Sequence, residues 1–317
     1  MENMDKTSSS QQNAPDFIGM GAPRAGTTWL YEVLRSHPKI WMPPIKELHY
    51  FDSLDDQMSY NRSTHKQFYR IKKFGFWRLR HYVASLVSIV YKSKLFKGDS
   101  VKTDLDWDCR FFGRGSDLQW YSSLFSRAIE NGFTAGEFTP DYALMQPKTA
   151  KLLVEINPDL KALLMFRDPI ERTWSNAVFY VTRKLNLNVN DISDEQWIEY
   201  CFREECLERS DYLRMYKTLN DVLPKEQIFV GYFDDVVARP EALVEKICSF
   251  LELETKPILE NEKLTLNVNS SAKKYKSEIP QMVELKLFSH FSKPLEELFL
   301  LLKNETIKDW LNKYSKD

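Results

Sequence analysis

The sequence has 317 residues, of which 43% are hydrophobic and 14% aromatic, enough to bury at least one sizeable core. This composition excludes a disordered chain, a collagen-like repeat and a mini-protein. The 44 basic and 45 acidic residues nearly cancel, which argues against nucleic acid as a partner and leaves local charge to attract any anionic one.

The polar start of the chain and its cysteine content favour a cytoplasmic protein. Residues 1–14 lack the apolar core of a signal peptide and predict a disordered tail. The longest apolar run, residues 82–91, is about half the ~20 residues that span a bilayer, so we expect no transmembrane segment. The cysteines are too few and too irregularly spaced for a disulfide framework or a zinc clip. They are Cys109, Cys201, Cys206 and Cys248.

Two stretches predict the same unit of strand, loop and helix. Residues 17–21 read as a short buried strand, followed by a Gly-rich loop and a helix over residues 27–36. Residues 162–166 form a continuous apolar run, as in a parallel strand covered on both faces. Asp168 then provides a helix N-cap, with Pro169 at the first helical position and Glu171 as the acid of a capping box.

A third strand is predicted at residues 227–232, followed by a helix over residues 240–251. Strands that alternate with helices indicate an α/β fold with a central, mostly parallel sheet flanked by helices. Because no long linker divides the chain, we expect a single domain over residues 15–317.

A basic insert interrupts the chain at residues 57–115. Its first part, residues 57–98, contains ten Lys or Arg residues and no acid. One interpretation is a helical hairpin with a solvated basic face. The other is an acceptor-side wall that receives an anionic substrate or makes peripheral contact with a membrane.

The first loop has the features of an anion cradle. It joins a strand to a helix N-terminus, where free backbone N–H groups and the helix dipole attract anions. Gly21 and Gly26 have Walker-like spacing, but Thr27 stands where that motif has lysine, and Arg24 is the nearby cation. The three-glycine fingerprint of dinucleotide-binding folds is absent, because Arg24 occupies the third glycine position.

Here the sequence resembles a family. The stretch GAPRAGTTWL resembles the 5′-phosphosulfate loop of sulfotransferases that use 3′-phosphoadenosine-5′-phosphosulfate (PAPS), and FRDPIERTWS resembles their 3′-phosphate motif. The resemblance extends over nearly the whole chain, is strongest to bacterial members and the glycan O-sulfotransferase branch, and implies a P-loop-like sulfotransferase fold. It implies PAPS as donor, with no metal required. The implied donor-binding residues are Pro23, Arg24, Ala25, Gly26, Thr27, Thr28, Trp29, Arg167, Ser175, Lys273, Lys274 and Tyr275.

The stretch KELHYFD resembles the segment that carries the catalytic glutamate in that family, which places Glu47 as general base beside Arg24. His49 is the alternative base, since two residues that are two apart in an extended segment point the same way. The segment GEFTPDY resembles the central acceptor-side segment of the family. With His49, it supplies the expected substrate contacts Phe138, Thr139 and Pro140.

The expected reaction is in-line transfer of a sulfuryl group to an acceptor hydroxyl, which depends on positioning and charge stabilisation. The acceptor class stays open between a carbohydrate, a small natural product and a carrier-bound hydroxyacyl group, and the oligomeric state is not readable. Two other functions remain: a P-loop kinase-like phosphotransferase and a non-catalytic nucleotide-binding or scaffold protein.

Overall fold

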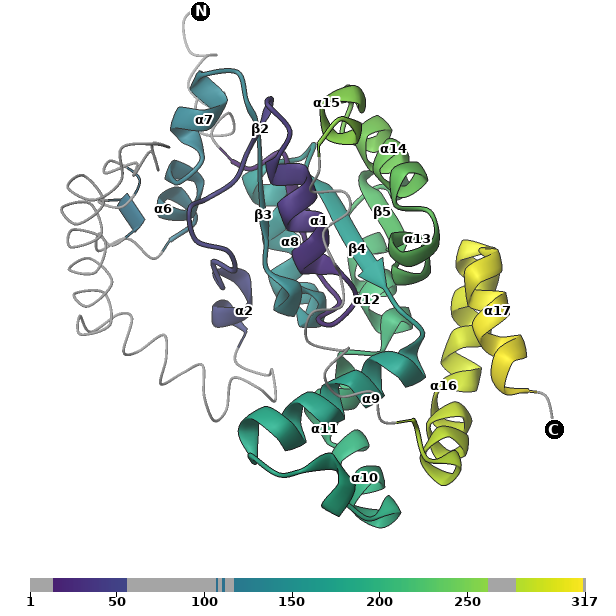
Figure 1. Ribbon diagram of the computed structural model, residues 1–317. Coiled ribbons are helices and arrows are strands. Elements are labelled where there is room, and N and C mark those ends of the chain that lie inside the picture. Colours follow the sequence, from purple (N-terminus) through teal and green to yellow (C-terminus); the bar gives the residue numbers. More distant parts are fainter. Residues whose placement is uncertain (1–13, 56–106, 108–109, 112–116, 262–277, 316–317) are drawn as a thin grey trace, which may run out of the picture.

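The computed structural model describes residues 14–55, 107, 110–111, 117–261 and 278–315 (Figure 1). Within them, five strands pair in parallel as one sheet in the order β2-β3-β1-β4-β5. The strands are β1 (Phe17–Gly19), β2 (Ile40–Trp41), β3 (Thr134–Phe138), β4 (Lys161–Phe166) and β5 (Ile228–Tyr232). This parallel central sheet confirms the predicted α/β class.

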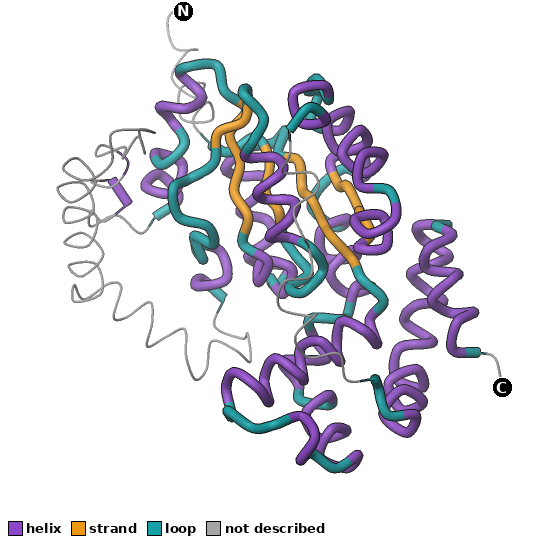
Figure 2. Tube along the Cα trace, viewed as in Figure 1, coloured by secondary structure: helices purple, strands orange, loops and turns teal. Residues whose placement is uncertain are grey.

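Helices cover both faces of the sheet (Figures 1 and 2). Helix α1 crosses the face turned toward the viewer, while α8 and α12 lie behind the strands. The described helices are α1 (Thr27–Arg35), α2 (Phe51–Leu54), α6 (Leu118–Ser123), α7 (Ser126–Glu130), η3 (Pro140–Leu144), α8 (Pro147–Ile156), α9 (Pro169–Phe179), η4 (Tyr180–Lys184), η5 (Val189–Asp191), α10 (Asp194–Cys201), α11 (Glu204–Glu208), α12 (Tyr212–Asn220), η6 (Lys225–Gln227), α13 (Phe233–Ala238), α14 (Pro240–Phe250), α15 (Lys256–Leu259), α16 (Gln281–Leu302) and α17 (Glu305–Tyr314).

The centre of the sheet is the centre of the core. All three residues of β1 and five of the six in β4 are buried, because helices pack on both faces. Gly19 in β1 lies beside Phe138 in β3, and a Cβ at Gly19 would come within 2.0 Å of the Phe138 ring. Only glycine therefore lets this ring pack across the end of β1.

The predicted element boundaries hold to within two residues. Strand β1 ends at Gly19 rather than at residue 21, although the Met20 and Ala22 amides still donate to carbonyl oxygens of β4 at 2.9 and 2.7 Å. Asp168 caps α9 as predicted, accepting from the Ile170 amide at 3.0 Å. The predicted capping box was wrong for Glu171: its carboxylate does not bond back to the helix N-cap but pairs with other side chains, as described below.

Several predictions fall outside the described residues: the tail up to residue 13, the body of the basic insert, and Lys273, Lys274 and Tyr275. Ala14, predicted as the last tail residue, is buried instead. At the end of the insert, Trp107 stacks on Phe111 with ring centroids 4.8 Å apart. The three described cysteines are free, buried thiols. None of the helices that the structure describes is long and apolar enough to cross a membrane.

Candidate functional site

The site lies where neighbouring parallel strands end. The carboxyl ends of β3, β1, β4 and β5 meet at one edge of the sheet, because the four strands are adjacent and parallel. These ends lead directly into Thr139, the loop of residues 20–26, Arg167 and Phe233, respectively. Ligands of open α/β sheets bind at this edge. The two stretches predicted to hold phosphate are thus brought together.

The loop after β1 leaves the start of α1 open to an anion. The N-cap residue Gly26 has φ 87°, no side chain caps the helix, and the first turn contains no acidic residue. A Cβ at Gly26 would lie 3.1 Å from the Phe233 ring, so glycine fits both the backbone conformation and the space. The N–H groups at the start of α1 are the ones from which the sequence predicts an anion cradle.

Arg24 extends from this loop along α9. Its Nη2 donates to the Ser175 carbonyl oxygen at 3.5 Å, and its guanidinium carbon lies 4.2 Å from the centroid of the Phe179 ring. Its Nε is buried and has no hydrogen-bond partner among the described residues. Arg24 and Ser175, which are 151 residues apart in the chain, are therefore neighbours in the fold.

Arg167 lies between the loop and α9. Its Nη1 donates to the Arg24 carbonyl oxygen at 3.5 Å, and its Nη2 donates to Glu171 at 3.1 Å. The guanidinium stacks over Phe233 at 4.7 Å. Like that of Arg24, the Arg167 Nε is buried without a partner in the part of the chain that the structure describes.

A third arginine adds to the positive charge. Arg172 is fully buried and donates to the Ser210 hydroxyl and the Cys206 carbonyl oxygen, and its Nη1 has no partner among the described residues. Burial, together with repulsion from Arg172 and Arg167, lowers the pKa of Arg24 to about 10. A ligand with several negative charges would complement the positive charge of Arg24 and Arg167.

On the other side of the loop, five side chains form a chain of polar contacts. The Lys46 ammonium donates to the Thr28 hydroxyl at 3.1 Å and to Glu47 Oε1 at 3.1 Å. Glu47 Oε2 lies 3.6 Å from His49 Nε2, and His49 Nδ1 lies 2.7 Å from Asp52 Oδ2. The two candidate bases, Glu47 and His49, are thus in contact with one another, and Lys46 links them to the phosphate loop.

The backbone that presents these side chains is not extended, contrary to the assumption behind their predicted orientation. Glu47 and His49 have φ of 66° and 53°, in the left-handed region that costs a non-glycine residue about 1 to 3 kcal/mol where it is held. Hydrogen bonds hold it here: the Glu47 amide donates to the Phe138 carbonyl at 3.0 Å, and the Tyr50 amide to the Tyr142 hydroxyl at 2.8 Å.

Glu137 organises this loop from the core. Its carboxylate is buried and accepts hydrogen bonds from Tyr121 at 2.5 Å, Thr139 at 2.8 Å and Tyr142 at 2.9 Å, together with one from the Leu48 amide. Burial raises the pKa of Glu137, and these donors oppose that effect. Sequence reasoning did not assign this role to Glu137.

The expected substrate contacts at the end of β3 and directly after it are buried. Phe138 is 1% exposed and packs edge to face on Phe17 and Tyr31. Thr139 donates to Glu137, and Pro140 is buried at the start of η3. The Phe138 carbonyl supports the loop of Glu47 and His49 by accepting from the Glu47 amide, and the Glu47 carboxylate itself is half exposed.

The two candidate bases, Glu47 and His49, differ in the direction of their pKa shifts. Burial opposes ionisation of Glu47, but hydrogen bonds from His49 and Lys46 outweigh it and lower the Glu47 pKa to about 2. Burial also disfavours the imidazolium, yet hydrogen bonds to Asp52 and Glu47 raise the His49 pKa to about 10. At neutral pH Glu47 is therefore an ionised acceptor of protons, whereas His49 already carries both of its ring protons.

His49, Asp52 and Asp141 could together approach a metal ion, because one ligand atom from each lies within 4.8 Å of the others. Their present contacts satisfy them differently. Asp141 pairs with Arg209 at 3.1 Å, and His49 is held as an imidazolium, which has no lone pair for a metal. The geometry is that of a hydrogen-bonded ion-pair network.

The comparisons with known proteins agree with this geometry. A model of the sulfotransferase family matches residues 15–257, so the chain belongs to the sulfotransferase family, a family of transferase enzymes. Carbohydrate sulfotransferase 15 of Homo sapiens is 22% identical over 276 residues, covering 75% of this chain. The match covers 44% of that relative, less than half of its length.

Two solved structures share the fold. A sulfotransferase from Alicyclobacillus acidocaldarius superposes with a TM-score of 0.55 at 19% identity, over 93% of this chain and 98% of that one. The sulfotransferase domain of the Synechococcus PCC 7002 olefin synthase gives a TM-score of 0.51 at 17% identity, over 89% and 90% of the two chains. These likenesses confirm the predicted fold.

The raised pKa of His49 has a measurable consequence for stability. A folded-state pKa of about 10, above the ordinary value of 6.5, stabilises the fold fully below pH 6.5, and this contribution is lost as the pH rises toward 10. We expect the stability advantage of the wild type over His49→Asn to shrink between about pH 6 and about pH 9.5 in urea unfolding. An advantage that stays constant or grows over this range would contradict the ion-pair network.

Proposed function

We propose that this protein transfers the sulfuryl group of PAPS to an acceptor hydroxyl, with Glu47 as general base. The acceptor oxygen forms a bond to sulfur while the bond from sulfur to the donor's phosphate oxygen breaks, leaving 3′,5′-ADP. The hydroxyl proton passes to Glu47. A cytoplasmic location stays a prediction.

The observation that carries this proposal is the set of buried guanidinium donors without partners. Arg24 Nε and Arg167 Nε, in the described part of the chain, both lack a hydrogen-bond acceptor beside the uncapped start of α1. Leaving such donors unsatisfied is costly unless a ligand completes them. PAPS carries phosphate groups at two separate positions. One could bind Arg24, in the loop after β1, and the other Arg167, at the end of β4. We assign residues 23–29 to the 5′-phosphosulfate, and Arg167 with Ser175 to the 3′-phosphate.

On the acceptor side, the electrostatics support Glu47 over His49 as base. The carboxylate is ionised and half exposed, while the imidazolium has no free lone pair and forms hydrogen bonds to Asp52 and Glu47. His49 is then the group that orients Glu47. The similarity to a carbohydrate sulfotransferase puts carbohydrate hydroxyls first among the acceptors to be screened, ahead of small natural products and carrier-bound hydroxyacyl groups.

Donor dependence tests the proposal against its two rivals. We expect radiolabelled sulfate to pass from PAPS to at least one member of an acceptor library. Transfer of phosphate from ATP to the same library would favour the kinase-like alternative. Binding of nucleotide with neither transfer would favour a non-catalytic binding protein.

Glu47→Gln should reduce kcat about 10²-fold or more, because glutamine keeps the shape of the side chain but cannot accept the proton. Its affinity for 3′,5′-ADP, measured by calorimetry, should stay near that of the wild type. The comparison variant His49→Asn should reduce kcat less, since it removes an orienting group. If His49→Asn abolishes turnover while Glu47→Gln retains most of it, the base is the histidine.

Arg167→Ala should remove the preference for a 3′-phosphate. We expect the wild type to bind 3′,5′-ADP more tightly than 5′-ADP, and the variant to lose about tenfold or more of that ratio, the size of a charge-assisted hydrogen bond. Calorimetric titration with both nucleotides measures it. Arg127→Ala, at an exposed arginine on α7, is the control and should leave the ratio unchanged.

A further inference from the structure

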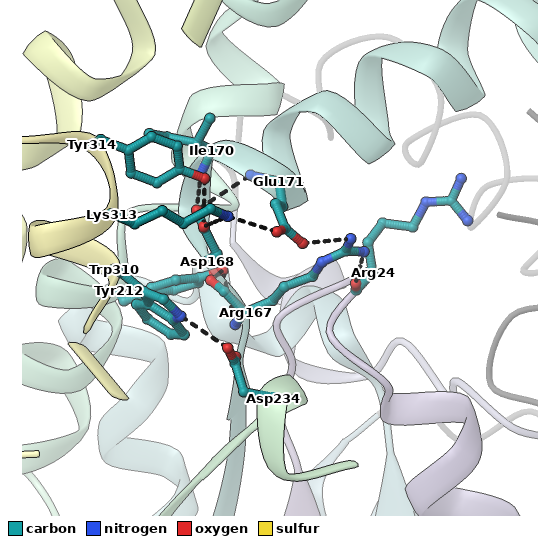
Figure 3. A network of polar contacts seen from close by, with 10 residues as sticks. All are labelled: Arg24, Arg167, Asp168, Ile170, Glu171, Tyr212, Asp234, Trp310, Lys313 and Tyr314. Carbon is teal, nitrogen blue, oxygen red and sulfur yellow. Dashed lines mark hydrogen bonds and ion pairs between the residues drawn. The ribbon is translucent and has the colours of Figure 1, made fainter. Parts of the chain in front are cut away.

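Helix α17 reaches the donor side of the site from beyond the family match, which ends at residue 257. Two of its residues, Lys313 and Tyr314, point toward the start of α9, and a third, Trp310, points toward Asp234 on α13 (Phe233–Ala238) (Figure 3). Trp310 Nε1 donates to Asp234 at 3.3 Å. Tyr314 and Lys313 both donate to Asp168 Oδ2, at 2.6 and 3.0 Å. The same Asp168 caps α9 through its other oxygen.

Lys313 also contacts the carboxylate that holds Arg167. Its Nζ lies 2.8 Å from Glu171 Oε1, while Glu171 Oε2 accepts from Arg167 Nη2 at 3.1 Å. The Glu171 side chain therefore bridges the two cations, as Figure 3 shows. Burial raises the pKa of Glu171, but the hydrogen bond from Lys313 and the charges of Lys313 and Arg167 outweigh it, so the pKa is lowered and the group is an anion.

An anion on Arg167 competes with any phosphate that binds there. A carboxylate and a phosphate oxygen accept from the same guanidinium N–H groups, so each contact that Glu171 makes with Arg167 is unavailable to the ligand. Lys313 supplies a second partner for the same carboxylate and balances its charge. With Lys313 present, two acids (Asp168 and Glu171) face two bases; without it, the group carries a net negative charge beside the expected phosphate.

We propose that Lys313 is a specificity-determining residue for the donor: by holding Glu171 it keeps Arg167 available to the 3′-phosphate. The inference rests on the proposed function, since it takes Arg167 as the 3′-phosphate ligand. Lys313 itself is a positioning residue, because it acts through Glu171 and Arg167.

The structure allows the charge to be removed without undocking the helix. Ile307 and Trp310 are buried and anchor α17 to the rest of the fold, and Tyr314 keeps its own bond to Asp168. The Lys313 side chain is 47% exposed, so methionine can replace its stem. Lys308 offers a matched control on the same helix: it is 50% exposed and pairs with Glu305 at 3.1 Å, without a contact to the site residues described here.

The experiment measures calorimetric affinities for 3′,5′-ADP and 5′-ADP in the wild type, Lys313→Met, Lys308→Met and the double variant Lys313→Met with Glu171→Gln. We expect Lys313→Met to lower the preference for 3′,5′-ADP about three- to fivefold, the size of a partly exposed charge pair, with a smaller effect at high salt. Lys308→Met should keep the wild-type ratio. The double variant removes one charge of each sign, so its ratio should return toward that of the wild type.

The outcomes separate this inference from the function on which it rests. If the wild type does not prefer 3′,5′-ADP, the assignment of the 3′-phosphate to Arg167 fails. If the wild type has the preference and Lys313→Met keeps it, or lowers the affinity for both nucleotides equally, the role of Lys313 is overturned. A double variant that stays as impaired as Lys313→Met would exclude Glu171 as the route.

Discussion

The parallel pairing of β1 with β3 and β4 is the constraint on which the site depends. Parallel strands end at the same edge, so the anion-binding loop, the segment of Thr139 and Arg167 have to meet although they are far apart in the chain. The close approach of Phe138 to Gly19 fixes how near β3 can lie at this edge. This strand register places Arg167, which follows β4, beside the loop after β1. It also places the end of β3 where its backbone supports Glu47.

A second constraint is the buried Glu137. A carboxyl group in a core is costly unless hydrogen bonds satisfy it, and here three hydroxyls and one backbone amide do so. Because that amide belongs to Leu48, satisfying Glu137 also fixes the residue between Glu47 and His49. The left-handed conformations on either side are thereby held by core hydrogen bonding, which is how local strain persists at functional sites.

The sequence predicted correctly those features that depend on interactions between residues close together in the chain. The strand, loop and helix at the start of the chain and the cap at Asp168 depend on neighbours within a few residues, and they lie where the sequence places them. Glu171 shows where this fails: its spacing predicts a bond to its own helix, yet two cations, one of them on α17, draw the carboxylate away. The φ angles of Glu47 and His49 could not be predicted either, because they depend on hydrogen bonds to the Phe138 carbonyl at the end of β3 and to the Tyr142 hydroxyl on η3.

The electrostatics differ between the two ends of the site, and Lys46 connects them. At the donor end, Arg24 and Arg167 each have a buried Nε without a partner among the described residues; at the acceptor end, Glu47 and Asp52 are each paired with a cation. Lys46 binds Thr28 on the donor side and Glu47 on the acceptor side. Under the proposed function, an anion bound at Thr28 would compete with Glu47 for this ammonium. Lys46 helps to lower the Glu47 pKa, so under the proposed function a donor that draws Lys46 away would raise that pKa and make the carboxylate a stronger base.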